Sequence, residues 1–299
     1  MPGCSRLRRR AFLAAGASML GVAKGAGTQS LPAVTIGNKS FSRLIVGGNP
    51  IGGFAHNTKR VSELMLQYFT VERTTQLILD CEKKGINTWQ SSYSEKVRDA
   101  LAAARERGSK MQFVCLTSVK QLDILKDVLA MKPVAICHHG NVTDDLIRTG
   151  QQQVVHDYVK RVHDQGILAG VSTHNPDNVA RMEDWGWEND LYMTCFYYLS
   201  RTPEEIAKIA GGKMLGELYL ESDPLRMTER IRQVRKPCLA FKILAAGRLC
   251  TSPATVERAF AFAYKNIKPS DAAIVGMWPV IFDEVSEDVR LAGKYARPV

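Results

Sequence analysis

Polar, aromatic and cationic residues stand directly after several short apolar stretches of this 299-residue chain. Residues 84–96 read KGINTWQSSYSEK, so Gln90 and Tyr93 follow an apolar run that ends at Trp89. Hydroxyl, imidazole, phenol and amine groups follow the later stretches in the same way: Thr117, Ser118, His138, His139, Ser172, Thr173, His174, Tyr197, Tyr198 and Lys242. Such groups donate hydrogen bonds and move protons. Carboxylates are nearly absent from these positions, which argues against the paired-acid chemistry of glycoside hydrolases.

Eight short apolar segments, each followed by a helical pattern, must position these residues. The predicted strands cover residues 44–48, 86–89, 111–116, 134–137, 168–172, 191–197, 238–243 and 272–276. Alternation of strand and helix predicts a parallel sheet. Eight such units in this length predict a closed (β/α)8 TIM barrel, whose functional sites lie at the carboxyl ends of the strands. An N-terminal β-hairpin that turns at Gly37-Asn38 is expected before the barrel.

The alternative architecture is an open, doubly wound sheet. That fold carries a glycine-rich phosphate-binding turn after its first strand, and the turn leads directly into a helix. The stretch VGGNPIGG has the glycines, but no helical pattern opens directly after it. Residues 49–69 instead form an unusually long connection. We expect this connection to be a lid or substrate platform over the barrel, or else a surface excursion with a short helix.

The N-terminus differs from the rest of the chain. A basic run is followed by a weakly apolar stretch too short to span a bilayer, and Arg9-Arg10-Ala11-Phe12-Leu13 resembles a twin-arginine export signal. Residues 1–30 are therefore predicted to be a signal peptide, residues 31–299 the barrel, and the mature protein periplasmic or otherwise exported. The net charge of +10 includes this basic leader. No clustered basic stripe indicates nucleic acid, and no membrane association beyond the signal is expected.

The order of several phrases resembles the aldo-keto reductase family over most of residues 33–293. GINTWQSSYSE is similar to the family's G-I-N-x-x-D-T-A-x-x-Y phrase, VAICHH to its strand ending in histidine, and GVSTHNPDNV to its G-V-S-N-H phrase. The aromatic strand TCFYYLSR and the closing IVGMWPVIFDEVSEDV are similar to later family segments. The resemblance implies a TIM barrel that reduces a carbonyl or sugar-type small molecule.

The same resemblance implies a catalytic set in which a tyrosine acid is tuned by lysine and aspartate, with a histidine that orients the carbonyl. Tyr93 lies two residues before the family's tyrosine position, Gln90 replaces the aspartate, and Ser118 stands near the lysine position. His138 matches the histidine, with His139 as the other possibility. Lys242 is predicted to supply the missing positive charge from across the barrel. These substitutions predict an altered acid site, because a tyrosine beside neutral groups keeps its ordinary pKa of about 10.

The resemblance also implies NADP or NAD as cofactor. Ser172 matches a residue that holds the nicotinamide amide, and Thr173 replaces the family's asparagine. Tyr197 is the expected stacking ring and Arg248 a substitute phosphate ligand. His138, His139 and His174 suggest a zinc site as an alternative, but adjacent strand residues point in opposite directions, so we expect hydrogen-bonded rim histidines instead of a metal site.

Three functions stay open from the sequence. The first is an exported oxidoreductase of aldo-keto reductase type. The second is a TIM-barrel lyase, isomerase or hydrolase that has lost hydride transfer and acts on a polar small molecule. The third is a binding protein without catalysis. Fold alone does not choose among them.

Overall fold

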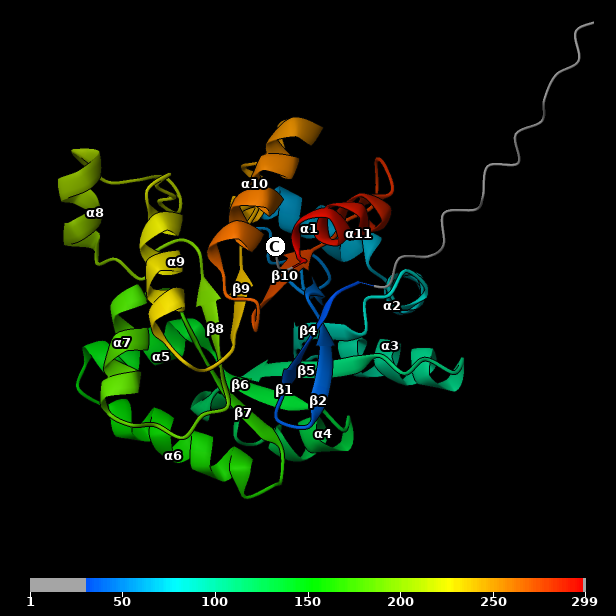
Figure 1. The fold of residues 1–299 in the computed structure, drawn as a ribbon, viewed down its shortest axis with the longest axis horizontal. Coiled ribbons are helices and arrows are strands. Elements are labelled where there is room, and N and C mark those ends of the chain that lie inside the picture. The colour runs from blue at the N-terminus through cyan, green and yellow to red at the C-terminus, as the bar shows by residue number, and fades with distance from the viewer. Residues whose placement is uncertain (1–30, 298–299) are drawn as a thin grey trace, which may run out of the picture.

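The computed structural model describes residues 31–297, and these form a closed eight-stranded parallel barrel surrounded by helices (Figure 1). The predicted (β/α)8 TIM barrel with an N-terminal hairpin is thereby confirmed. The strand order around the barrel is β10-β3-β4-β5-β6-β7-β8-β9, and every neighbouring pair is parallel. The strands are β3 (Leu44–Gly47), β4 (Thr88–Ser92), β5 (Gln112–Thr117), β6 (Ala135–His138), β7 (Leu168–Thr173), β8 (Leu191–Cys195), β9 (Cys238–Phe241) and β10 (Ala272–Gly276).

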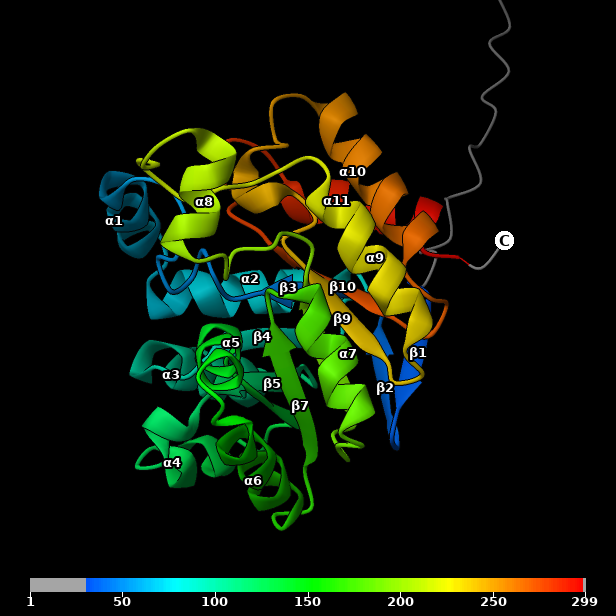
Figure 2. The same ribbon diagram turned by 90° about the vertical axis from the view of Figure 1, so that its left-hand side faces the viewer.

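The hairpin of β1 (Ala33–Ile36) and β2 (Lys39–Ser42) covers the amino end of the barrel. Its turn uses Gly37 at φ 57°, a conformation that suits glycine. A side chain at Gly37 would come within 2.7 Å of Leu168, because the turn lies against the start of β7. Phe41 packs with Ile45 inside the barrel. Figure 2 shows the hairpin at the opposite end of the barrel from α1 and α8, so the carboxyl end is left for a functional site.

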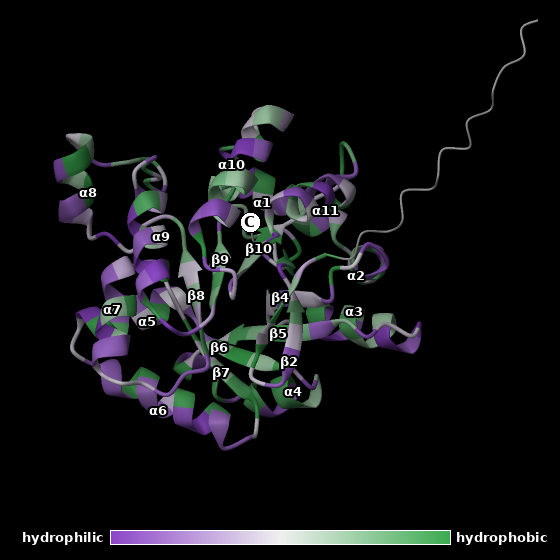
Figure 3. Ribbon diagram, in the orientation of Figure 1, coloured by the Kyte–Doolittle hydropathy of each residue, from purple (hydrophilic) through white to green (hydrophobic). Residues whose placement is uncertain are grey.

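Helices pack against the outside of the strands and enclose a second apolar layer. They are α1 (Lys59–Tyr68), α2 (Val71–Lys83), α3 (Glu95–Glu106), α4 (Leu125–Ala130), α5 (Gly140–Arg148), α6 (Gln152–His163), α7 (Pro176–Asp184), α8 (Pro203–Ala210), α9 (Asp223–Gln233), α10 (Pro253–Asn266) and α11 (Glu284–Tyr295). Hydropathy follows this layering, with apolar strands in the middle and polar outer helix faces (Figure 3). None of the helices within residues 31–297 has both the length and the apolar character needed to cross a bilayer.

Side-chain caps explain where several helices begin. Ser94 accepts a hydrogen bond from the Val97 amide at the start of α3, and Ser252 does the same for Thr255 at the start of α10. Thr202 and Glu205 form a reciprocal capping box at α8. These caps fix the length of the loops that leave the carboxyl ends of the strands.

The helical stretch after β6 is divided into α5 and α6, because Gly150 adopts φ 75° between them. The second barrel strand was expected to end at Trp89, but β4 continues to Ser92. Gln90 is therefore a strand residue of the barrel wall and not the first residue of a loop. The predicted N-terminal signal lies outside the described residues.

Candidate functional site

The strand register decides which rim residues face the inside of the barrel. Side chains alternate along a strand, and register partners on parallel neighbours share a face. Cys137 lies in the interior cluster, so the next residue, His138, faces outward, and its register partner Val171 packs in the outer layer. Gln90 is paired with the interior residue Val114 and faces inward.

His138 is held between the barrel and its helices. Its Nδ1 lies 2.7 Å from the Thr143 hydroxyl, and its ring meets the edge of Tyr158 at a centroid distance of 5.1 Å. Burial, and to a lesser degree the charge of His139, lower the pKa of His138 to about 3. The expectation that His138 points into the barrel mouth is wrong, because strand alternation gives that direction to His139.

Tyr93 also lies on the outer side. It packs against the layer between strands and helices, and its phenol acts electrostatically on Arg98 of α3. It follows β4, where Gln90 is inward and Ser91 is outward against Gly48. Tyr93, His138, Tyr197 and Lys242 were expected to surround one cavity, and this expectation is wrong for Tyr93 and His138.

A histidine–aspartate pair occupies the inner rim after β7. His174 Nδ1 lies 3.1 Å from Asp144 Oδ2, and the same oxygen accepts a 2.9 Å hydrogen bond from the His174 amide. Asn178 donates to the other oxygen at 2.8 Å, and the Thr173 hydroxyl donates to it as well. These four contacts fix the carboxylate and place the imidazole proton on Nδ1. His174 Nε2 makes no hydrogen bond within residues 31–297, so it is left for a ligand.

Burial keeps this imidazole neutral. His174 and Asp144 are both nearly inaccessible, with side chains 8% and 3% exposed. Desolvation lowers the pKa of His174 below its ordinary value, although the hydrogen bond to Asp144 acts in the opposite direction. A neutral imidazole with an oriented, unpaired Nε2 is the form that accepts a proton. The pair therefore has the arrangement of a general base and its orienting carboxylate.

Lys242 and His139 lie beside this pair. The charge of Lys242 lowers the pKa values of both His139 and His174, and burial, the largest cause, brings that of His139 to about 4. His139 Nδ1 is buried and has no hydrogen-bond partner in the described part of the chain. Two imidazoles and one amine therefore lie close enough to interact electrostatically where β6, β7 and β9 end.

Gln90 and Ser172 complete the inner wall of this mouth. Gln90 is 7% exposed and makes no side-chain hydrogen bond within residues 31–297. Ser172 is paired in register with the interior residue Met193, and it lies against Gly140 at the start of α5. Their amide and hydroxyl groups are available to hydroxyl or carbonyl groups of a polar ligand.

Two loops are joined over the mouth by a pair of side chains that we call the clasp, His56 and Glu217. His56 Nδ1 lies 2.8 Å from Glu217 Oε1, and Asn49 Nδ2 lies 3.2 Å from His56 Nε2. Tyr219 donates to Glu217 at 3.0 Å. Burial would raise the pKa of Glu217, but the bonds from His56 and Tyr219 and the charge of Lys242 outweigh it and lower this pKa. The long connection after β3 is thus tied to the loop between α8 and α9.

The residues expected to hold a dinucleotide are engaged with other parts of the chain. Tyr197 packs on Tyr219 at a ring-centroid distance of 4.8 Å, and the Arg248 guanidinium lies 3.9 Å from the centre of the Tyr219 ring. Arg248 also donates to the His56 carbonyl at 3.0 Å. Thr173 faces outward and donates to Asp144, and only Ser172 faces the mouth. Three of the four predicted cofactor residues, Thr173, Tyr197 and Arg248, are therefore not free to line an open nicotinamide cleft.

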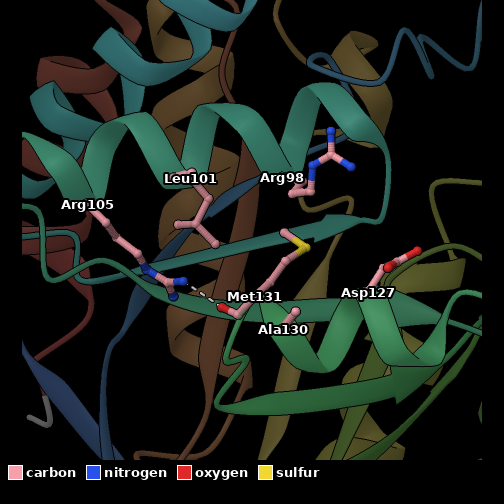
Figure 4. A pocket seen from close by; sticks show the side chains of 7 residues that line it. Arg98, Leu101, Arg105, Asp127, Ala130 and Met131 are labelled. Carbon is pink, nitrogen blue, oxygen red and sulfur yellow. Dashed lines mark hydrogen bonds between the residues drawn. The ribbon is translucent and has the colours of Figure 1, made fainter.

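Other kinds of site are less well supported. Within residues 31–297, no group of three or more His, Cys, Asp or Glu side chains is arranged to hold a metal ion. A groove of about 200 Å³ lies on the helix layer, lined by Arg98, Leu101, Ala102, Arg105, Asp127, Ala130 and Met131 (Figure 4). Arg105 crosses it to donate to the Met131 carbonyl at 2.6 Å. This groove lies between α3 and α4, outside the barrel, and has no base or nucleophile of the kind that the mouth contains.

Comparison with known proteins gives the fold and little beyond it. No family model matches the chain, and no curated protein matches. Among solved structures, a putative 2,5-diketo-D-gluconic acid reductase B is similar at 8% identity and a TM-score of 0.53, over 89% of this chain and 87% of that one. The Gox0644 apoform is similar at 9% identity and a TM-score of 0.53, over 90% and 97% of the two chains.

A glycerol dehydrogenase from Gluconobacter oxydans, AKR11B4, is also similar, at 12% identity and a TM-score of 0.48, over 90% of this chain and 97% of that one. The two structures with a TM-score of 0.53 share the barrel fold with this chain at low sequence identity. At this identity the similarity establishes the shared barrel, whereas the chemistry has to be argued from the side chains of this chain.

The pair of His174 and Asp144 was not predicted from the sequence. His174 was noted only as a strand-end histidine, and Asp144 lies in a helix 30 residues earlier. The sequence did contain a signal for this pair. His174 directly follows β7, and Asp144 lies in the helix that follows β6, the strand next to β7. Neighbouring strands of a parallel barrel bring such positions together at one rim.

Proposed function

We propose that the chain is an enzyme that moves a proton next to the carbonyl group of a small hydroxycarbonyl or sugar-type molecule. The observation that carries this proposal is the hydrogen bond that His174 Nδ1 donates to Asp144, which leaves Nε2 as a neutral base in the barrel mouth. Removal of a proton from carbon beside a carbonyl needs such a base and a positive group for the developing oxyanion. The reaction class is therefore an isomerase or a lyase.

Each residue of the mouth has a role in this scheme. His174 Nε2 takes the proton from carbon, and the Asp144 carboxylate stabilises the imidazolium that forms. Lys242 stabilises the negative charge that develops on the carbonyl oxygen. Gln90 and Ser172 bind hydroxyl groups of the substrate. Asp144 acts through His174 and is a positioning residue.

Reduction of the same carbonyl with NADP or NAD is the second candidate. It is supported by the similarity of the barrel to aldo-keto reductases and by the inward position of Ser172. The predicted acid groups Tyr93 and His138 do not reach the mouth, and the predicted cofactor residues are engaged elsewhere. For these reasons proton transfer is placed first. Export of the mature enzyme to the periplasm is also proposed, on the basis of Arg9 and Arg10, and the N-terminal residue of the mature protein would test it.

Hydrogen–deuterium exchange at carbon tests the first candidate. The purified protein is incubated in D2O with dihydroxyacetone, glyceraldehyde, fructose or glucose, and NMR records loss of the proton beside the carbonyl. We expect catalysed exchange with at least one of them, and His174→Gln should slow it by about 100-fold or more because the base is lost.

A second histidine–carboxylate pair supplies the control. His163 lies 2.7 Å from Asp190, next to the amino end of the barrel strands. His163→Gln should leave the exchange rate unchanged, because this pair lies at the opposite end of β7 and β8 from the mouth. Equal rates in His174→Gln and the wild type would contradict the proposal.

A further inference from the structure

Lys242 has an unusual backbone and an unpaired amine. It follows β9 with φ 60°, in the left-handed region that disfavours residues with a side chain. Such conformations persist where surrounding structure enforces them, and they cluster at functional sites. Within residues 31–297, the Lys242 amine makes no salt bridge or hydrogen bond, and its recorded contact is with the Phe241 ring, whose centre is 5.3 Å from Nζ.

The surroundings of this amine suit covalent chemistry. Lys242 Nζ and the His174 ring both lie against Phe241, 5.3 Å and 5.5 Å from the centre of its ring, and the charge of Lys242 acts on His139, His174 and Glu217. The two imidazoles are neutral, and His174 Nε2 is unpaired. An amine that attacks a carbonyl must first lose a proton, and a neutral imidazole beside it can accept that proton. The same imidazole, once protonated, can return the proton to the departing hydroxyl.

We propose that Lys242 is a nucleophile that forms a Schiff base with the carbonyl carbon of its hydroxycarbonyl substrate. This inference rests on the proposed function and makes its mechanism covalent. Neutral Nζ attacks the carbonyl carbon, and the oxygen takes a proton to give a carbinolamine. Loss of water then gives a protonated imine, with no net oxidation or reduction. The imine draws electrons from the adjacent carbon, so that His174 removes its proton more readily, and water finally releases the product and restores the amine.

Reduction with borohydride tests this directly. The wild-type protein is mixed briefly with dihydroxyacetone or glyceraldehyde, treated with sodium borohydride, digested and mapped by mass spectrometry. We expect one stable adduct at Lys242, with a mass increase equal to the carbonyl compound minus one oxygen atom. Adduct formation at Lys242 should exceed that at exposed lysines such as Lys59 by at least tenfold.

Lys236 provides a matched control at the other end of the same strand, where its amine lies 3.2 Å from Glu183. Lys236→Arg should keep the adduct, and Lys242→Arg should abolish it while circular dichroism shows an unchanged fold. Carbon exchange is measured in the same samples. Absence of a Lys242 adduct overturns the covalent role, whether or not exchange occurs. Exchange without an adduct leaves the proposed function standing, and absence of both overturns the two together.

Discussion

At the scale of single residues, the direction of a side chain matters more than its type. His138 and His139 are identical in sequence and adjacent, yet the first contacts Thr143 and Tyr158 and the second lies beside His174 and Lys242. A resemblance between sequences pointed to His138, because it ends the strand as in the related phrase. Because side chains alternate along a strand, His139 is the one that faces the mouth. A shift of one residue along the strand therefore decides which histidine can take part in chemistry at the rim.

The Asp144 carboxylate sets the proton affinity of His174, which leads to a pH prediction. Burial lowers the pKa of His174, so the rate of carbon exchange should fall only when the pH drops below about 6.5, the ordinary histidine value. Asp144→Asn removes a charge that raises this pKa. The acidic limb of the pH–rate profile should therefore move to still lower pH, and the plateau rate should fall by about 100-fold because a weaker base remains.

The control for this variant is Asp190→Asn, which alters the His163 pair at the other end of the barrel. In that variant, the acidic limb of the pH–rate profile and the plateau rate of carbon exchange should equal those of the wild type. A limb that moves to higher pH in Asp144→Asn, or one that does not move, would show that His174 is not the base.

At the scale of elements, the loops after the strands were harder to predict than the strands. The long connection after β3 was expected to be a lid, a substrate platform or a surface excursion. Its contact with Glu217 was not predicted, since Glu217 lies 161 residues from His56. No local pattern links these positions. They meet because both connections leave the carboxyl end of the barrel, and the clasp then depends on details of loop conformation such as φ 52° at His56.

Breaking the clasp should loosen these loops without unfolding the barrel. In Glu217→Ala, backbone amides of residues 49–58 and 211–222 should exchange with D2O about two- to fivefold faster, which corresponds to a partly exposed ion pair worth roughly 0.5–1 kcal/mol. Mass spectrometry of the exchanged peptides measures this effect. Glu188→Ala breaks a similar surface pair with His156 and should leave these segments unchanged. Slower or equal exchange in Glu217→Ala would refute the role given to the clasp.

At the scale of the whole molecule, the barrel followed from the sequence. Eight apolar segments alternate with helical patterns, and interior positions such as Ile45, Val114 and Leu239 need only be apolar and of suitable size. The site did not follow in the same way. Gln90 was expected at the inner rim and its register places it there, whereas Asp144 and His174 form a pair only through folding. Apolar periodicity is a property of one segment, and a catalytic pair is a property of two.

This separation explains how the barrel can be shared with the two solved structures of TM-score 0.53 at only 8% and 9% identity. Strands and helices tolerate many apolar sequences, so the fold persists as rim residues change. In this chain the rim contains an imidazole–carboxylate pair and an unpaired amine, and the phenol at position 93 lies outside it. The chemistry is therefore expected to follow the mouth of this chain more closely than the fold that it shares.

The origin of the transferred hydrogen tests the central claim most directly. The protein is given its best carbonyl compound in D2O together with NADPH labelled with tritium at the nicotinamide position that donates hydride. The account predicts deuterium from the solvent on the carbon next to the carbonyl, no tritium in the product, and unchanged nicotinamide absorbance. Tritium on the former carbonyl carbon, with consumption of NADPH, would contradict the account and establish hydride transfer.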